Sequence, residues 1–211
     1  VISSRLYCFS DLSGNNLVNV ATARATTAKN IANKFGFDNC TGDADEIIKN
    51  ESINTVFIAT PHNLHAPYVI KALQANKNVF VEKPLCLTKE ELEEIREVEN
   101  KSTGQLMVGF NRRFATQIIA LKKELNNLLP KAINYRINAG KLPANHWTQD
   151  PEIGGGRIIG EACHFIDLCS FIAGSTIAKV AANALKDANN IIDTVSISLA
   201  FENGSVASIS Y

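Results

Sequence analysis

Two short stretches of the sequence combine residue types that can do acid and base chemistry. The first is an apolar run, Asn78–Val81, followed by Glu82-Lys83-Pro84. Pro84 lacks an N–H and fixes φ, so we expect the chain to leave a strand directly after Lys83. Partial desolvation there would help Lys83 to carry a proton near neutral pH, and Glu82 could hold its ammonium or a ligand hydroxyl. An ordinary solvated turn is the alternative interpretation of these residues.

The second stretch is Gly154–Asp167, which opens with three glycines. Glu161, His164 and Asp167 follow at intervals of three, which places them on one face of a predicted helix. Flanking carboxylates would fix the histidine tautomer and raise its basicity, as a general acid/base requires. A helix with a half-buried histidine is the alternative. The cysteines beside His164 match no familiar zinc spacing, so no metal site is predicted.

The first stretch belongs to a half of the chain that alternates predicted strands and helices. This order predicts a parallel sheet with right-handed crossovers, a Rossmann-like doubly wound α/β domain over residues 1–111. Parallel strands end at one edge of such a sheet, where these folds bind their ligands. Residues 1–16 suggest the end of a helix and a polar turn. The expected strands are 17–21, 53–59, 78–81 and 105–109, and the expected helices are 26–35 (capped by Thr26), 43–50 (capped by Asp43), 64–76 and 88–102 (opened by a Thr88–Glu91 capping box).

The second half shows the alternation of strands that are exposed on one face. It predicts an α+β domain with an open, mainly antiparallel sheet over residues 112–211. Phe110–Phe114 is expected to leave the preceding strand, and a helix is expected to follow it to about Leu129. A second helix is expected over 158–173, and the expected strands are 132–139, 177–185, 192–201 and 205–211.

Composition excludes several classes of partner. The 211 residues are 45% hydrophobic and carry 21 basic and 21 acidic residues, so neither nucleic acid nor an anionic membrane surface is an expected partner. The apolar runs are shorter than the roughly 20 residues of a membrane-spanning helix, and no leader opens the chain. Five cysteines without a CxxC pair predict reduced, mostly buried thiols. A globular, cytoplasmic protein with a small-molecule partner is therefore expected.

Taken in order along the chain, these motifs resemble the Gfo/Idh/MocA family of nicotinamide-dependent oxidoreductases. The resemblance covers nearly all of the sequence, and the order and spacing of the motifs carry it. The set comprises Thr60-Pro61, His65, Glu82-Lys83-Pro84, Gly109-Phe110-Asn111-Arg112-Arg113-Phe114, Trp147, Asp150-Pro151, and the three glycines before His164-x-x-Asp167.

The resemblance implies hydride transfer between NAD or NADP and a hydroxyl carbon of a sugar, inositol or nucleotide sugar. It implies a Rossmann domain followed by a domain whose open sheet forms a homodimer or tetramer. His164 is the expected acid/base, Lys83 its electrostatic partner or alternate proton carrier, and Glu161 a further catalytic carboxylate. Arg24 is a cation that could meet a 2′-phosphate, which favours NADP slightly. The expected substrate-binding residues are Lys83, Trp147, Asp167 and His164, and the expected cofactor-binding residues are Thr22, Arg24, Thr60, Pro61, His65, Glu82, Lys83 and Arg112.

The sequence departs from the family pattern in two places. Gly160 stands where many members carry an aspartate, four residues before the histidine, and Glu161 is the nearest acid. The G-x-G-x-x-G turn that cradles the cofactor pyrophosphate does not occur before Leu17. We therefore expect a fragment, shortened at both ends, that binds cofactor poorly by itself. The alternatives are a non-catalytic ligand-binding or regulatory member of the fold, and a catalytic domain that works only within a longer fused chain.

Overall fold

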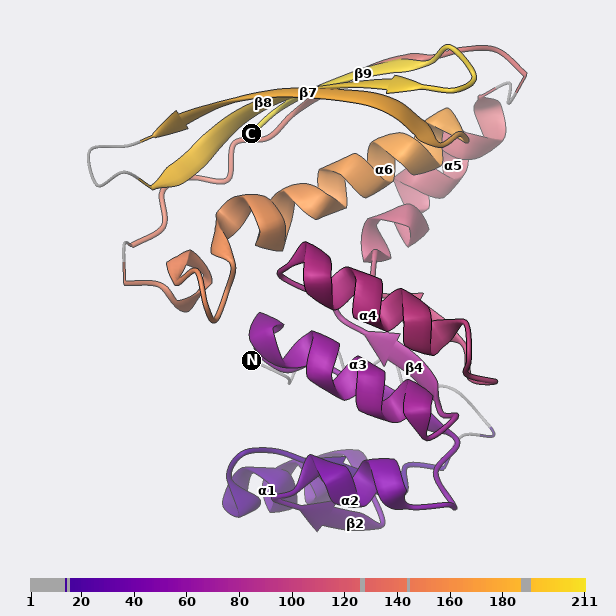
Figure 1. Ribbon diagram of the computed structural model, residues 1–211, viewed down its shortest axis with the longest axis vertical. Helices are drawn as coiled ribbons and strands as arrows, with labels where there is room; N and C mark the ends of the chain where they lie inside the picture. Colours follow the sequence, from indigo (N-terminus) through magenta and orange to yellow (C-terminus); the bar gives the residue numbers. More distant parts are fainter. Residues whose placement is uncertain (1–13, 15, 126–127, 144, 187–190) are drawn as a thin grey trace. The chain divides into compact units, whose positions relative to one another are not determined.

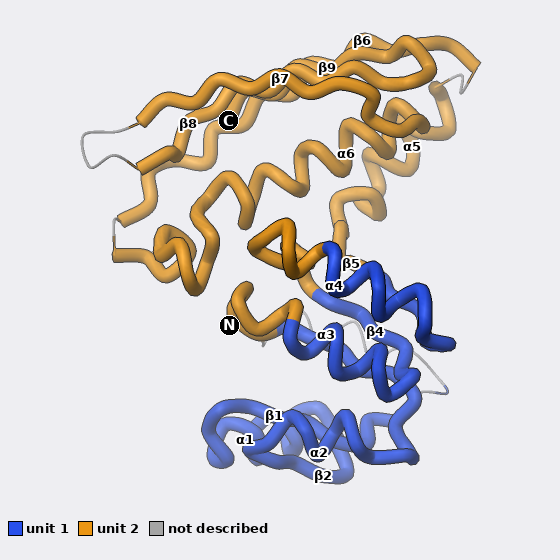
Figure 2. Tube along the Cα trace, viewed as in Figure 1, with its two compact units in different colours: residues 1–59, 67–81, 93–107 blue, residues 60–66, 82–92, 108–211 orange. Residues whose placement is uncertain are grey.

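The computed structural model describes residues 14, 16–125, 128–143, 145–186 and 191–211, and it divides the chain into two compact units (Figure 2). Unit 1 comprises the described parts of Val1–Ala59 with Pro67–Val81 and Glu93–Met107. Unit 2 comprises Thr60–Ala66, Glu82–Leu92 and the described parts of Val108–Tyr211. The two short segments that follow strands of unit 1 thus pack with the C-terminal half. The predicted linear boundary between residues 111 and 112 remains a prediction about the domains.

Unit 1 contains parallel strands connected by helices, which confirms the predicted α/β class (Figure 1). One parallel pair and one three-stranded sheet of order β3-β4-β5 are present among the described residues, and β3 pairs with β4 in parallel. The strand pair β1–β2 includes β2, which the sequence analysis did not predict. The elements are β1 (Asn19–Ala21), α1 (Ala25–Phe35), β2 (Asn39–Thr41), α2 (Ala44–Lys49), β3 (Thr55–Ile58), α3 (His65–Gln74), β4 (Asn78–Val81), α4 (Lys89–Glu99) and β5 (Leu106–Val108).

Two of the three predicted helix caps are present. The Asp43 side chain accepts a hydrogen bond of 2.9 Å from the backbone N–H of Asp45 at the start of α2. Thr88 and Glu91 form the predicted reciprocal capping box of α4, with contacts of 3.1 and 3.2 Å. The predicted cap of α1 is wrong, because that helix begins at Ala25, one residue before Thr26. The predicted helix and turn within residues 1–16 fall almost wholly outside the described residues.

Unit 2 is built on a four-stranded sheet of order β6-β9-β8-β7. The pairs β7–β8 and β8–β9 are antiparallel and β6–β9 is parallel, so the prediction of a mainly antiparallel sheet is confirmed. Helix α6 covers one face of the sheet (Figure 1), where Phe165 and Cys169 pack against Ile197 and Ile209. The elements are α5 (Thr116–Glu124), β6 (Ala132–Arg136), α6 (Cys163–Ala173), β7 (Ile177–Lys186), β8 (Ile192–Phe201) and β9 (Val206–Ser210).

Two predicted helices of unit 2 differ from the observed ones. The helix predicted to follow Phe114 and to end near Leu129 begins at Thr116, as expected, but ends at Glu124, where Leu125 is extended. The helix predicted over 158–173 is two elements, a π-helical turn at Ile158–Ala162 followed by α6. Short π-helical segments widen a helix by one residue and are frequent at functional sites. The predicted uniform spacing of Glu161, His164 and Asp167 along one helix therefore does not hold.

The described cysteines are free thiols, and Cys8 lies outside the described residues. Cys40 is exposed, so the prediction of buried thiols holds for Cys169 but is wrong for Cys40, which lies on the short strand β2. Over the described ranges, no helix is both long enough and apolar enough to cross a membrane.

Candidate active site

The loops that follow β3 and β4 belong to unit 2 and are tied to each other by one buried histidine. His65 has no solvent exposure, and its ring nitrogens lie 2.6 Å from the carbonyl oxygen of Pro84 and 3.0 Å from that of Thr60. Both acceptors are backbone atoms, so the contact fixes the course of the two loops. His65, predicted to bind cofactor, therefore holds the two loops together through its side chain.

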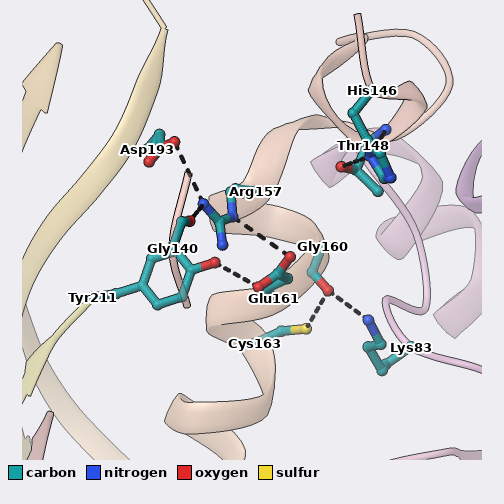
Figure 3. A network of polar contacts seen from close by, with 10 residues as sticks. All are labelled: Lys83, Gly140, His146, Thr148, Arg157, Gly160, Glu161, Cys163, Asp193 and Tyr211. Carbon is teal, nitrogen blue, oxygen red and sulfur yellow. Dashed lines mark hydrogen bonds and ion pairs between the residues drawn. The ribbon is translucent and has the colours of Figure 1, made fainter. Parts of the chain in front are cut away.

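Lys83 lies in the loop after β4, next to Pro84, whose carbonyl contacts His65. Its Nζ donates a hydrogen bond of 2.8 Å to the carbonyl oxygen of Gly160, in the middle of the π-helical turn (Figure 3). A carbonyl occupies only one of the three donors of an ammonium, which leaves Lys83 able to bind a ligand oxygen as well. The structure therefore brings together the two stretches that the sequence analysis singled out.

Gly160 lies against the ring of His62. A Cβ atom at this position would lie 2.9 Å from Cε1 of His62, so a side chain here would force a shift. In this chain a histidine ring fills the space beside residue 160, and a backbone carbonyl is the group that meets Lys83.

His62 is a buried imidazole that the sequence analysis did not place in the site. Its Nδ1 lies 2.8 Å from the carbonyl oxygen of Gly154, and since a carbonyl only accepts, the proton sits on Nδ1. Burial lowers the pKa of His62, and the charge of Lys83 adds to that effect against the opposing hydrogen bond to Gly154. His62 is therefore a neutral ring at neutral pH, with a lone pair on Nε2. The ring of Trp147 meets it edge-on at a centroid distance of 4.8 Å.

The three glycines that open the second stretch each occupy a position where the backbone conformation or a close contact favours glycine. A Cβ on Gly154 would lie 2.3 Å from Cα of Thr148, so only glycine lets the two backbone segments approach. Gly155 and Gly156 adopt φ values of 73° and 81°, which other residues rarely adopt. The loop that results carries the Gly154 carbonyl to His62 and delivers the chain into the π-helical turn.

His164 lies buried in the first turn of α6, with the ring of Phe110 edge-on to it at a centroid distance of 6.2 Å. Its neighbour in the chain, Cys163, and Lys83 both contact the carbonyl oxygen of Gly160, at 3.8 Å from Sγ and 2.8 Å from Nζ. Burial raises the pKa of the Cys163 thiol to about 11, while the positive charge of Lys83 acts in the opposite direction. The two predicted catalytic residues Lys83 and His164 therefore lie in one neighbourhood around the start of α6.

The two arginines at the start of the C-terminal half have partners within unit 2. Arg113 pairs with the buried carboxylate of Asp167 through two contacts, one of them of 2.8 Å from Nε, and this hydrogen bonding raises the pKa of Arg113. Arg112 donates to the hydroxyl of Tyr135 at 3.1 Å and lies over the ring of Phe165. Asp167, predicted to bind substrate, and Arg112, predicted to bind cofactor, are thus engaged in contacts inside the unit.

Glu161 is also engaged, by residues that the sequence analysis did not consider. Its Oε2 accepts a hydrogen bond of 2.5 Å from the hydroxyl of Tyr211, and its Oε1 lies 3.5 Å from Nε of Arg157. Burial, together with the Glu161 carboxylate, raises the pKa of Tyr211. The carboxylate predicted to be catalytic therefore sits in a polar cluster with an arginine and a tyrosine (Figure 3).

One observation fits the dinucleotide that the sequence analysis predicts. Oγ1 of Thr60, two residues after β3, is buried and has no hydrogen-bond partner among the described residues. Such orphaned hydroxyls are rare in proteins and mark positions where a ligand or water completes the hydrogen bonding. In unit 1, Thr22 donates to the carbonyl of Arg24, whose exposed side chain precedes α1. The part of the chain that is described contains no group of three or more side chains arranged to bind a metal ion.

Comparison with known proteins identifies the family. Residues 4–110 match the sequence profile described as "Oxidoreductase family, NAD-binding Rossmann fold", and residues 130–211 match that of the "GFO/IDH/MocA C-terminal domain".

The chain belongs to the Gfo/Idh/MocA family.

Several members of the Gfo/Idh/MocA family are similar over most of this chain. Inositol 2-dehydrogenase of Rhizobium meliloti is 30% identical over 94% of the chain, and levoglucosan dehydrogenase of Pseudarthrobacter phenanthrenivorans is 31% identical over 74%. The structure of levoglucosan dehydrogenase in complex with NADH and levoglucosan superposes with a TM-score of 0.81 at 28% identity over 92% of the chain. These findings confirm the resemblance and the fold class.

This Gfo/Idh/MocA chain spans part of the length of its relatives. It covers 62% of the Rhizobium inositol 2-dehydrogenase, 42% of the Pseudarthrobacter levoglucosan dehydrogenase and 57% of the levoglucosan dehydrogenase structure.

The family motifs account for Lys83 and His164, but three neighbouring residues escaped the sequence analysis. His62 follows Thr60-Pro61, where it reads as part of a helix cap, and only its proximity to Gly160 reveals its place. Arg113 belongs to the family motif, but its pairing with Asp167 was not predicted. Arg157, which follows the three glycines, was not predicted as part of the site. A charged residue in a run of Gly, Ile and Ala could have indicated a buried ion pair.

Proposed function

We propose that this chain belongs to an NAD(P)-dependent oxidoreductase that transfers a hydride to or from a hydroxyl carbon of a sugar or inositol. The observation that carries the proposal is the hydrogen bond between Lys83 and Gly160, which anchors a cation at the turn leading into His164. Sugar and inositol dehydrogenases among the relatives support the substrate class. A bound nicotinamide would supply the hydride acceptor or donor.

The chain's own residues would handle the proton. In the oxidative direction, the substrate hydroxyl gives its proton to His164 as the C–H hydride leaves its carbon. Lys83, with donors left over from the Gly160 contact, holds the same oxygen and stabilises the negative charge that develops on it. Trp147 lies half-exposed beside His62 and offers an apolar wall for a sugar ring. In the reductive direction, His164 returns the proton to the carbonyl oxygen.

For the cofactor, we propose that the orphaned hydroxyl of Thr60 and the backbone of Pro61 contact the dinucleotide. Glu82, half-buried beside Lys83, is a further cofactor-binding candidate. Thr22 and Arg24 are proposed for its adenosine part, and the cation of Arg24 favours the 2′-phosphate of NADP slightly. His65 and Arg112 would act indirectly, by holding the loop and the sheet, because their side chains are engaged in internal contacts.

The test uses the protein that carries this sequence. NADH and NADPH are titrated by cofactor fluorescence, and turnover is assayed on a panel of inositols, sugars and nucleotide sugars. The variant His164→Asn keeps a polar side chain of similar size without the titrating ring. We expect it to bind cofactor as the parent does and to lose turnover by about 10²- to 10⁴-fold. If neither dinucleotide binds, a ligand-binding or regulatory role in the same fold replaces this proposal.

The open face of the sheet in unit 2 is proposed to dock a second copy of the chain. Leu185 on β7 and Val206 on β9 are at least half exposed, and their strand partners Thr194 and Ala200 lie outside the core that α6 covers. Exposed apolar side chains on an open sheet face are typical of an interface. Light scattering after size exclusion is expected to give a dimer or tetramer, and Val206→Asp is expected to shift it toward the monomer. A monomeric parent protein would contradict this proposal.

A cytoplasmic location is retained as a prediction of the sequence analysis. Cell fractionation followed by immunodetection of the protein tests it.

A further inference from the structure

Arg157 is an almost completely buried cation, 3% exposed, at the residue before the π-helical turn. Its Nη1 donates to the carbonyl oxygen of Gly140 at 2.6 Å and lies 3.4 Å from Oδ2 of Asp193 on β8. Its guanidinium lies over the ring of Tyr211 at 5.2 Å from the centroid. We call Arg157, Glu161, Asp193, Tyr211 and the Gly140 carbonyl the Arg157 cluster (Figure 3).

The Arg157 cluster holds the π-helical turn from both of its ends. Arg157 precedes the turn, and Glu161 is its fourth residue, joined to Arg157 by the ion pair of 3.5 Å. Glu161 is in turn held by the hydroxyl of Tyr211, at the end of β9. The turn is therefore fastened to the strands of the sheet at two points, through Asp193 and through Tyr211. Between those points stands Gly160, whose carbonyl accepts the hydrogen bond from Lys83.

A π-helical turn needs such fastening because π-helical segments are rare single turns within α-helices, and the sequence could relax into the α-helical register. Relaxation would rotate the Gly160 carbonyl away from Lys83. A buried ion pair is weak evidence for stability but is well suited to fixing one arrangement among several. We therefore interpret the Arg157 cluster as a means of fixing the position of the π-helical turn rather than of stabilising the fold.

We propose that Glu161, with Arg157 and Tyr211, is a positioning group that fixes the π-helical turn so that the Gly160 carbonyl orients Lys83. This rests on the proposed function and assigns Glu161 a role other than proton transfer. The sheet then contributes to catalysis through Tyr211 and Asp193, which touch neither substrate nor cofactor in this assignment.

The variants are chosen to remove one contact each. Tyr211→Phe deletes only the donor to Glu161, and Glu161→Gln keeps the shape of the side chain while removing the charge that Arg157 faces. Thr176→Val is the matched control, because Thr176 makes an equally short hydroxyl–carboxylate hydrogen bond, 2.5 Å to Glu202, elsewhere in unit 2. Arg157→Lys tests rescue, since a lysine keeps the charge but not the planar fork that reaches several acceptors.

The first readout does not depend on activity. Lys83 is labelled with an amine-reactive reagent in the protein that carries this sequence, and its rate is followed by mass spectrometry against the exposed Lys101. A nitrogen that donates to a fixed carbonyl reacts slowly. We expect labelling of Lys83 to accelerate by about threefold or more in Tyr211→Phe and Glu161→Gln, as expected when one charge-assisted hydrogen bond is loosened, and to stay unchanged in Thr176→Val. If the labelling rate of Lys83 is unchanged in both Tyr211→Phe and Glu161→Gln, the proposal is overturned.

The second readout separates positioning from proton transfer. In Glu161→Gln and Tyr211→Phe we expect kcat to fall by about 10- to 100-fold with the KM for cofactor unchanged, as expected when a catalytic group is misplaced. Both limbs of the pH profile of kcat should remain. Loss of a limb in Glu161→Gln would show that Glu161 itself transfers a proton and would overturn the proposal. If the parent protein lacks turnover altogether, the proposed function fails, while the labelling of Lys83 still decides the role of the cluster.

Discussion

Strand β4 has a lysine at each end, and the two lysines are held in different ways. Lys77, directly before β4, is 8% exposed, and its Nζ donates to the carbonyl oxygens of Asn50 at 2.8 Å and Ile53 at 2.6 Å. Lys83, two residues after β4, is half-buried and donates to the one carbonyl of Gly160. Lys77 fastens the end of α2 and the approach to β3 within unit 1, whereas Lys83 keeps donors for a ligand within unit 2.

This difference shows how one strand can carry a structural end and a functional end. Ligands of parallel α/β sheets bind beyond the carboxyl ends of the strands, and Lys83 stands at that end. The same residue type is used at both ends because an ammonium on a long stem reaches buried carbonyls. What separates the two is how many donors the fold has already used. The comparison fails if Lys77 contributes to turnover, or if Lys83 contributes to stability as Lys77 does.

The largest effect is expected from Lys83→Met, which keeps the stem and removes the ammonium. Turnover should fall by about 10³-fold, because the charge that develops on the substrate oxygen loses its partner. The free energy of unfolding should change little, since the Gly160 carbonyl is the only hydrogen-bond acceptor of the Lys83 ammonium among the described residues. Steady-state kinetics and urea unfolding of the same preparation measure both quantities.

The control for that experiment is Lys77→Met, which should retain turnover per folded molecule. Equal loss of turnover in the two variants would mean that both ends of β4 serve the site, and the comparison would fail.

The next effect in size is on stability, and it is expected at Lys77. In Lys77→Met the carbonyls of Asn50 and Ile53 lose their donor while buried, which costs about 2 kcal/mol of the free energy of unfolding. Urea unfolding followed by circular dichroism measures the loss. A variant as stable as the parent would show that water replaces the ammonium at this end of β4 and that Lys77 is dispensable.

Much of the comparison could be predicted from the sequence, because it depends on local patterns. The run Asn78–Val81 and the proline after Lys83 place the strand and its exit, and both agree with the structure. Asp43 and the Thr88–Glu91 box likewise act within a few residues of themselves. The family motifs, read in order, predicted the fold class, which is confirmed. The roles of Lys83 and His164 stay predictions.

The remainder could not be predicted, because it depends on contacts between distant segments. His62 and Gly160 are 98 positions apart, and only the fold reveals their proximity. The π-helical turn has no signature in a run such as Ile158–Ala162, which is compatible with an α-helix. The engagement of Glu161 by Tyr211 depends on where β9 ends, and no spacing rule relates those residues.

A smaller effect, on the pH dependence of stability, is expected at His62, in the loop after β3. The folded state lowers the pKa of His62 below its ordinary 6.5, chiefly through burial, so the unfolded chain binds the proton more readily. Stability is therefore complete above 6.5 and declines as the pH falls below it. In His62→Asn, whose amide can still donate to Gly154, this part of the acid sensitivity should disappear. Unfolding free energies in urea at about pH 8 and pH 5.5 measure it.

Lys77→Met should keep the acid sensitivity of the parent, because Lys77 is not among the groups that shift His62. Identical pH dependence in His62→Asn and the parent would contradict the assignment of a buried, neutral ring at the site.

The smallest effect is expected at Cys163, whose thiol senses the charge of Lys83. Burial raises the pKa of Cys163 to about 11 and Lys83 opposes that rise, so the thiolate that reacts with iodoacetamide should become scarcer in Lys83→Met. Alkylation of Cys163, followed by mass spectrometry, should slow by about twofold, with the exposed Cys40 as the internal reference. Lys77→Met should leave the rate unchanged. This measurement needs no substrate, because the thiolate responds directly to nearby charge. If the alkylation rate of Cys163 is the same in Lys83→Met and the parent, the Lys83 ammonium does not lie near the start of α6. The proposed difference between the two ends of β4 would then be wrong.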